Sequence, residues 1–452
     1  MPAEPRTIAQ LSRALLAREV TSEAVTERCL AAIEEKNPSL NAFIAVFADE
    51  ARAQARAADR EMAAGTHRGP LHGVPISLKD LLDVRGTVTT AASKVRESHV
   101  AQADAPTVTH LRNAGAVIVG KCNLHEFAFG TTNEDSAFGP ARHPLDPSRS
   151  PGGSSGGSAV SVATGMAFAS IGTDTGGSIR IPAAACGIVG LKAGVGEIST
   201  AGVVPLSRSL DHVGPLCRSV EDASIVYDAL RGASHDGGSP ARDVRGLRVG
   251  IPRPYFMTLL DSQVASTFES ACERLRSAGV VLEDVALAHA TEIAPIYLHI
   301  VLAEAAAYHA KTLESRPDDY TPNVRLRLEM GRYILAEDYA RALRGRDVLR
   351  REVDAALDGR DALLLPTLPI PAPKLGVATV KVGASEEPVR NITLRLTQPF
   401  NLSGHPALTM PCGNTMDGLP VGAQLVGRHQ RTHDLLQVGR SLEGYLFPGA
   451  SR

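Results

Sequence analysis

Apolar residues near the start of the chain recur at the spacing of amphipathic helices. Val25, Cys29 and Ile33 lie four residues apart, so they share one face of a helix. Asn37-Pro38 predicts the end of that helix, because proline has no backbone N–H with which to continue it. Three helices are therefore expected here, over residues 7–19, 21–36 and 47–64.

Two continuous apolar runs are typical of strands that are buried on both faces of a sheet. Residues 74–78 follow a glycine-containing loop and lead directly into Lys79. Residues 116–119 follow a predicted helix at 106–114, with Gly115 just beyond its end. Strands that alternate with helices in this way predict an α/β fold.

The remainder of the chain continues this alternation. Ser219 stands three residues before Asp222, a pattern that marks a helix start. Residues 232–245, rich in Gly, Ser and Asp, could be a linker, but a surface loop within one domain is the preferred interpretation. Further helices are expected over 158–169, 220–230, 264–278, 295–312 and 325–359, and further strands over 248–251, 362–365, 407–410 and 421–426, the last two joined through Asp417-Gly418.

Composition excludes several classes of protein. The 452 residues are 44% hydrophobic, which is enough apolar surface to form a folded core. The 47 basic and 49 acidic residues give a net charge of -2, so no basic footprint for nucleic acid stands out. Glycine is uneven: residues 151–200 hold 12 of the chain's 41 glycines. Backbone freedom is therefore concentrated in one segment, where we look for chemistry.

The cysteines, the N-terminal residues and the apolar stretches indicate the cellular compartment of the protein. The six cysteines are scattered without a C-x-x-C pair, as expected of reduced core residues. Residues 1–6 do not begin a secretory signal peptide. The most apolar long stretch, 296–307, is expected to be too short to cross a membrane. We therefore expect a cytoplasmic protein.

Lys79 is the first candidate for chemistry, because it ends a predicted buried strand. A lone lysine in such a place most simply extends its charged end to the surface. The alternative is that burial lowers its pKa, so that the neutral amine can act as a base.

The second candidate segment is Ser-Pro-Gly-Gly-Ser-Ser-Gly-Gly-Ser at residues 150–158. A flexible linker would have this composition, but the apolar run that follows argues against one. The segment satisfies G-x-S-x-G at 152–156, yet residues 146–151 contain two prolines and cannot form the strand that a nucleophile elbow requires. Glycines around serines instead suit unusual backbone geometry with exposed amide donors.

The third candidate segment, residues 171–182, places Ser178 directly after Gly176-Gly177. A serine beside free backbone N–H groups meets the needs of an acyl-transfer nucleophile next to an oxyanion hole. A helix cap formed by Ser178 or Thr175 is an equally good interpretation of this segment alone.

Taken together, the three segments resemble the amidase signature family, and the resemblance covers nearly the whole chain. The one clear departure is Ala193-Gly194 after Leu191-Lys192, where the family usually has Pro-Thr; we expect the chain still to turn there. The other matching segments are residues 133–139, 186–192, 211–215, 401–406 and 418–422.

The resemblance implies the amidase signature fold, an α/β fold whose central mixed β-sheet is covered on both faces by helices. A single domain would span residues 1–452. It would consist of an N-terminal helical segment (1–70), the signature core (71–231) and a C-terminal part (246–452) that completes the same domain.

The resemblance also implies a Ser–Ser–Lys triad. Ser178 matches the nucleophile, Ser154 the bridging serine that follows a cis peptide bond, and Lys79 the base. The implied oxyanion-hole amides are those of Thr175, Gly176, Gly177 and Ser178. This chemistry needs no metal or other cofactor.

We therefore expect a hydrolase of the C–N bonds of small-molecule amides that acts through an acyl-enzyme on Ser178, with carbamates (urethanes) and esters as further substrates. The alternative is the catalytic A-type subunit of a glutamyl-tRNA(Gln)/aspartyl-tRNA(Asn) amidotransferase, although only Tyr333 and Tyr339 follow residues 330–332, where that subunit is tyrosine-rich. A non-catalytic scaffold is disfavoured by the intact Lys79, Ser154 and Ser178.

The expected partner is a small-molecule amide or carbamate substrate, with no nucleic acid and no membrane, and a homodimer is possible. Candidates for the substrate pocket are the mostly apolar helix at 296–308 and the loop at 130–133. For the helix, core packing or a dimer face is the preferred interpretation.

Overall fold

Strands and helices alternate along most of the chain, as the apolar pattern predicts. The computed structural model describes residues 4–235 and 241–448, so residues 1–3, 449–452 and the middle of the 232–245 segment, 236–240, lie outside the description. The strands of the described chain are β1 (Phe43–Val46), β2 (Pro75–Lys79), β3 (Val117–Cys122), β4 (Ala169–Asp174), β5 (Val189–Lys192), β6 (His212–Cys217), β7 (Arg248–Pro252), β8 (Val281–Val285), β9 (Ala362–Pro366), β10 (Thr379–Val382), β11 (Ser385–Pro388), β12 (Ala407–Asn414) and β13 (Pro420–Val426). The helices are α1 (Ile8–Leu16), α2 (Ser22–Leu40), α3 (Ala48–Ala63), α4 (Pro106–Asn113), α5 (Gly156–Ala163), α6 (Arg180–Cys186), α7 (Val220–Leu230), α8 (Ser262–Ser277), α9 (Ile293–Ser315), α10 (Pro322–Gly331), α11 (Ala336–Leu357), α12 (Val389–Leu394), α13 (Pro399–Leu402) and α14 (Thr432–Leu446).

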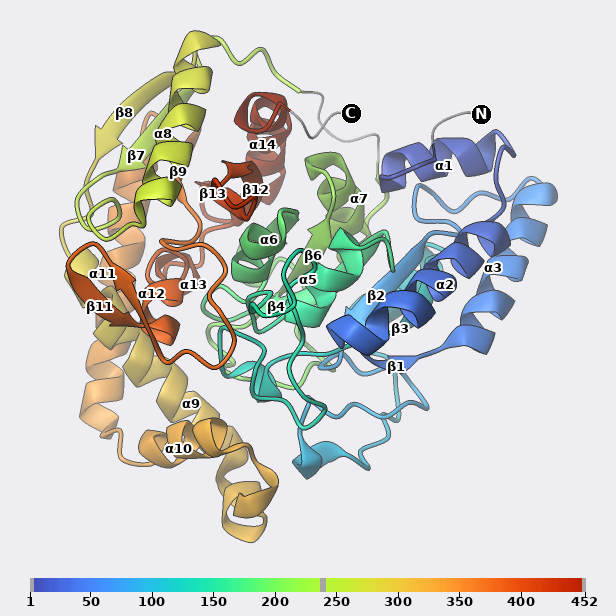
Figure 1. Ribbon diagram of the computed structural model, residues 1–452, viewed down its shortest axis with the longest axis horizontal. Coiled ribbons are helices and arrows are strands. Elements are labelled where there is room, and N and C mark those ends of the chain that lie inside the picture. Colours follow the sequence, from blue (N-terminus) through green and yellow to red (C-terminus); the bar gives the residue numbers. More distant parts are fainter. Residues whose placement is uncertain (1–3, 236–240, 449–452) are drawn as a thin grey trace.

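Within the described ranges, eleven strands form one mixed sheet in the order β1-β3-β2-β4-β6-β5-β12-β13-β9-β7-β8. The strands β3, β2 and β4 are parallel, as are β9, β7 and β8, and antiparallel pairs join the two groups. Figure 1 shows β2 and β3 on one side of the molecule and β7, β8 and β9 on the other, with β4 nearer the middle. The sheet passes from one half of the chain to the other where β5 pairs with β12, at Leu191 and Leu408.

Helices cover both faces of this sheet. Successive strand side chains point to opposite faces. In β9, Leu364 joins the hydrophobic cluster that includes α7, α8 and α14, whereas Leu363 and Leu365 join the cluster that includes α9, α10 and α11. All six cysteines are buried and free, as expected of core residues. The expected fold class, an α/β protein with a mixed sheet between helices, is confirmed.

Several predicted helix boundaries are wrong. Helix α2 passes through Pro38 and ends at Leu40, and Asn41 caps it with a positive φ of 50° and an N–H bond to Asn37 O (2.8 Å). Proline is tolerated there because it removes only one bond of the last turns. The predicted helix at 158–169 is the shorter α5, since Gly165 adopts a φ of 79° and the chain then enters β4.

The predicted helix at 325–359 is two helices, α10 and α11. Gly331 ends α10 directly against α9, where a Cβ atom would overlap Leu302 O. This close approach turns the chain before α11 begins at Ala336. Nothing in the apolar spacing signals such a contact, so the sequence pattern continues across the break.

Helix α9 and the turn before it, Ala290–Ser315, are long and apolar enough to cross a membrane by length and composition alone. The helix therefore extends well beyond the apolar stretch at 296–307 that the sequence singled out. Its Ile300, Val301 and Ala305 are packed in the core beside α10 and α11. A buried core helix passes the same test of length and apolarity.

Candidate active site

Two parallel strands bring Lys79 to the point where the second and third candidate segments meet. Strands β2 and β4 pair in parallel, with Leu78 opposite Ile171, so both end at the same edge of the sheet. Lys79 is the last residue of β2, and its Nζ donates to Thr173 Oγ1 (2.7 Å) near the end of β4. The same Nζ lies 2.7 Å from Ser154 Oγ. The structure thus brings the predicted base into contact with the predicted bridging serine.

Burial sets the charge state of Lys79. The side chain is fully buried, and this desolvation lowers its pKa to about 7, although Asp174 and Asp211 act in the opposite direction. A lysine with that pKa is neutral in a large fraction of molecules near neutral pH. A protonated ammonium can only donate hydrogen bonds, whereas a neutral amine can also accept one. Lys79 can therefore take a proton across its contact with Ser154.

The loop that carries Ser154 is held by close backbone packing. The Gly153–Ser154 peptide bond is cis, as the family resemblance implies. A Cβ atom on Gly153 would stand 2.8 Å from Asn133 N, so only glycine fits against the loop at 130–133. His125 N donates to Ser154 O (3.1 Å), and Gly156 N donates to Asn133 Oδ1 (3.0 Å).

Ser178 stands on the neighbouring loop, between β4 and α6. Its carbonyl oxygen accepts from Ser155 N (3.1 Å), which ties the two serine-bearing loops together. Ser178 is 5% exposed, whereas Ser154 is fully buried, so Ser178 is the more accessible of the two to a substrate.

The backbone N–H groups predicted to form an oxyanion hole are free to bind a ligand. Within residues 4–235 and 241–448, no acceptor takes the N–H of Thr175, Gly176, Gly177 or Ser178. The loop is fixed through other groups: Thr397 Oγ1 donates to Gly176 O (2.6 Å), and Thr175 Oγ1 donates to Asp211 Oδ1 (2.6 Å). Burial raises the pKa of Asp211 to about 6.

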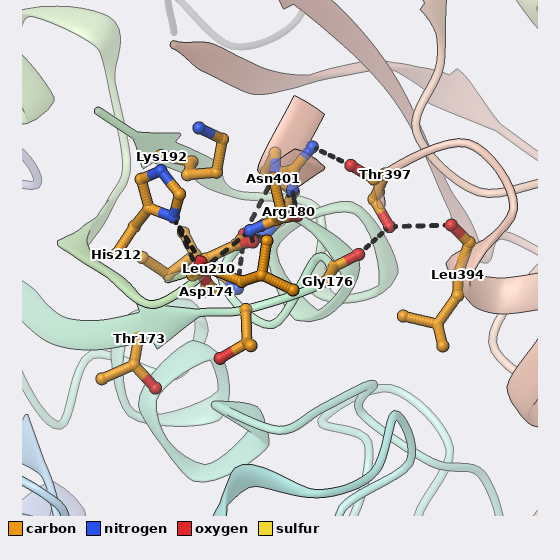
Figure 2. Close-up of polar contacts among 12 residues, drawn as sticks. Thr173, Asp174, Gly176, Arg180, Lys192, Leu210, His212, Leu394, Thr397 and Asn401 are labelled. Carbon is orange, nitrogen blue, oxygen red and sulfur yellow. Dashed lines mark hydrogen bonds and ion pairs between the residues drawn. The ribbon is translucent and has the colours of Figure 1, made fainter. Parts of the chain in front are cut away.

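A buried ion pair closes the Ser178 loop at its base (Figure 2). Arg180 binds both carboxylate oxygens of Asp174, through Nε (3.0 Å) and NH2 (2.9 Å). Asp174 Oδ2 also accepts from Ile179 N (3.1 Å). Burial alone would raise the pKa of Asp174, but the charge and hydrogen bonds of Arg180 hold it below its usual range. The chain between residues 174 and 180 is therefore a closed turn around the predicted nucleophile.

The C-terminal part of the chain completes this network. Arg180 donates to Thr397 O (2.8 Å), Gln424 Oε1 (2.6 Å) and Asn401 Oδ1 (2.7 Å), and Asn401 Nδ2 donates to Asp174 Oδ1 (2.8 Å). Arg180 and Asn401 belong to the matching sequence segments, but the sequence alone assigned them no role. The close spacing of Asp174 and Arg180 around Ser178 was the signal that could have suggested their pairing.

The departure at Ala193-Gly194 leaves the local path of the chain intact. A turn forms at Val195-Gly196, as expected, and Val195 N donates to Gly404 O (3.0 Å). Lys192 is fully buried beside it and donates to Ala193 O (3.0 Å). Among the described residues, no three His, Cys, Asp or Glu side chains are grouped as a metal site would require.

Gly177 offers a direct test of the predicted oxyanion hole. Its φ is 144°, and a Cβ atom there would overlap Thr397 Oγ1, so Gly177→Ala must displace the loop. Because the loss of one oxyanion donor costs about 10²- to 10³-fold in kcat, we expect a loss of that size in steady-state assays. Gly165→Ala is the matched control: its φ is also positive, at 79°, but nothing lies near its added Cβ atom. Equal activity in the two variants would argue against an oxyanion hole at this loop.

Comparison with known proteins shows the family and the fold. A family model described as Amidase matches residues 24–436. An amidase from Pseudomonas putida is 41% identical over 97% of this chain and 95% of its own length. The A-type subunit of a glutamyl-tRNA(Gln) amidotransferase from Roseiflexus sp. (strain RS-1) is 38% identical over 96% of this chain and 95% of its own length. A crystal structure of an amidase has 39% identity and a TM-score of 0.92, and covers 97% of this chain and 99% of the other.

The fold and the family match define an enzyme of the amidase class. The chain belongs to the amidase signature family, as the sequence motifs indicated.

Proposed function

We propose that this enzyme hydrolyses C–N bonds other than peptide bonds in small linear amides, through an acyl-enzyme on Ser178, with carbamates and esters as side substrates. The observation that carries the proposal is the 2.7 Å contact between Ser154 Oγ and a buried lysine whose pKa is about 7. We place the activity in the cytoplasm, because six buried, unpaired cysteines suit a reducing compartment.

In the proposed acylation step, Ser178 Oγ attacks the carbonyl carbon of the amide. The Ser178 proton passes to Ser154 Oγ as the Ser154 proton passes to the neutral amine of Lys79. The carbonyl oxygen becomes negative and accepts hydrogen bonds from the free N–H groups of residues 175–178. When the C–N bond breaks, the proton returns through Ser154 to the departing amine.

In the proposed deacylation step, a water molecule takes the place of the departed amine. The same relay removes its proton, and the attack on the acyl carbon releases a carboxylic acid and regenerates the Ser178 hydroxyl. An ester of the same acid gives the same acyl-enzyme with an alcohol as the leaving group, and a carbamate that loses its amine gives an alkoxycarbonyl-enzyme instead. Discrimination among them then depends on the pocket around the leaving group.

The second candidate function is that of the A-type subunit in a tRNA-dependent amidotransferase, and the Roseiflexus relative favours it. Such a protein would use the same acyl-transfer chemistry within a complex. The free hydrolase is supported by the TM-score of 0.92 to a solved amidase.

The two functions differ in what the purified chain does alone. We expect it to release an aryl amine from acyl anilides or aryl carbamates, measured by absorbance, and we expect Ser178→Ala to release none. Turnover confined to glutamine, and seen only after amidotransferase partner proteins are added, would instead support the second function.

A further inference from the structure

A cavity of about 410 Å³ shares a wall with the Ser154 loop. His125, which lines the cavity, donates its backbone N–H to Ser154 O. Thr131 and Thr132, which also line it, pack their backbone against Gly153. A ligand bound in this cavity would therefore lie close to the proposed proton relay.

Arg390 stands where this cavity meets a second one of about 360 Å³, since it lines both. Tyr297 lines the second cavity, and its hydroxyl packs against Gly176 of the Ser178 loop. The two cavities thus flank the two serine-bearing loops, and the Arg390 guanidinium is the charged group common to both.

The guanidinium of Arg390 is unpaired. Across the described ranges it makes no hydrogen bond and no ion pair, and its Nε is buried without an acceptor. Its carbon lies 5.9 Å from the centroid of the Phe129 ring, which offers only a weak attraction to a cation. A half-buried cation without an acceptor is costly, and an anionic ligand that accepted its hydrogen bonds would remove that cost.

A second cation faces the same cavity. The guanidinium carbon of Arg327, on α10, also lies 5.9 Å from the Phe129 ring centroid, and the guanidinium donates to Phe129 O (2.6 Å). Burial and the positive charge of Arg390 lower the pKa of Arg327 to about 10. Two like charges near one cavity repel each other, and an anion between them would relieve that repulsion.

The acidic residues of the cavity walls leave Arg390 without a partner. In the first cavity, Asp135 Oδ2 lies 3.1 Å from His125 Nε2, and Glu134 accepts from a backbone N–H. Within the described chain, neither of these carboxylates nor that of Glu387, which lines the second cavity, forms an ion pair with Arg390. The positive charge there is left for a ligand.

We propose that Arg390, supported by Arg327, binds a carboxylate group carried by the substrate, so that the preferred substrates are anionic amides. The inference rests on the proposed function and specifies its substrate class. A guanidinium offers two donors in one plane, and the two oxygens of a carboxylate can accept from both at once. An amide substrate without a carboxylate cannot use this pair of donors.

The test compares anilides that differ only in a carboxylate. In one arm the charge is on the acyl side, with the mono-anilide of succinate against butyranilide. In the other arm it is on the leaving group, with 4-acetamidobenzoate against acetanilide. We expect the carboxylate to raise kcat/KM by about 10- to 100-fold in one of the two arms. The arm that responds identifies which half of the substrate, the acyl group or the leaving group, reaches Arg390.

Replacement of Arg390 separates recognition from catalysis. We expect Arg390→Met to abolish the preference, because it lowers kcat/KM far more for the charged anilides than for the neutral ones, and Arg390→Lys to restore part of it. Arg325→Met is the matched control, because Arg325 is on the same helix as Arg327 but pairs with Glu329 and Asp318. It should keep the full preference.

Two results would overturn the inference: no preference for the carboxylate in either arm, or equal losses on charged and neutral anilides in both Arg390 variants. If no anilide is hydrolysed at all, the proposed function fails on its own. Calorimetric binding of the charged anilides to Ser178→Ala still decides the inference in that case. The inference is supported if the double variant Ser178→Ala, Arg390→Met binds the charged anilides at least about tenfold more weakly than Ser178→Ala does. Unchanged binding refutes the inference.

Discussion

Ser178→Ala is expected to lower kcat for amide hydrolysis by about 10⁴- to 10⁶-fold, because it removes the atom that forms the acyl-enzyme. The substitution deletes one oxygen from a side chain that is 5% exposed, and the loop is held by backbone and neighbouring groups. The fold should therefore persist, and circular dichroism and thermal unfolding should match the parent protein.

The control for this variant is Ser158→Ala, which removes a hydroxyl from the same Gly–Ser segment but on α5. We expect it to keep activity within about threefold, as for a substitution outside the reacting groups. A Ser178→Ala enzyme with more than a few per cent of the parent rate would exclude Ser178 as the nucleophile.

Lys79→Met is expected to lower kcat/KM by about 10²- to 10⁴-fold, the usual contribution of a general base. Methionine fills a similar volume but cannot accept a proton from Ser154 Oγ, which lies 2.7 Å from Lys79 Nζ. The pH profile identifies the role of the lysine. Since the Lys79 pKa is lowered to about 7, the amine is neutral above that pH and becomes protonated as the pH falls.

The parent rate should therefore decline as the pH falls through about 7, approaching tenfold per pH unit, and level off above it. The measured value belongs to the coupled Lys79–Ser154 site. Lys79→Met should lose this limb while keeping its weak residual activity. If the rate of Lys79→Met declined at the same pH as that of the parent protein, the decline would belong to another titrating group, which would contradict Lys79 as the base.

Much of the site could be predicted from the sequence because its elements are local. Lys79 ends a continuous apolar run, and the glycines around Ser154 and Ser178 occur where side chains would collide with neighbouring backbone or side chains. The groups that would collide are mostly distant in the sequence, such as Asn133 for Gly153 and Thr397 for Gly177, but each close approach requires glycine at one position and so leaves a visible pattern. The roles of Lys79, Ser154 and Ser178 themselves came from the family resemblance.

The parts that could not be predicted depend on contacts between distant segments. Arg180 meets Asn401 across 221 residues and Gln424 across 244, and no local pattern encodes either contact. The short antiparallel strands β5 and β6 contain glycine or proline and lack clear alternation, so neither was expected. Helix α10 ends where Gly331 packs against Leu302 of α9, and this contact between two helices leaves no local pattern in the sequence.

The most direct test of the proposed acyl-enzyme is the mass of the protein during turnover of a slowly deacylated aryl ester, measured after acid quenching. We predict an adduct equal to the acyl group, mapped by peptide fragmentation to Ser178, present in the parent protein and absent from Ser178→Ala. An adduct on Ser154 or Ser155, or turnover with no adduct while the aryl alcohol is released in a burst, would contradict an acyl-enzyme on Ser178.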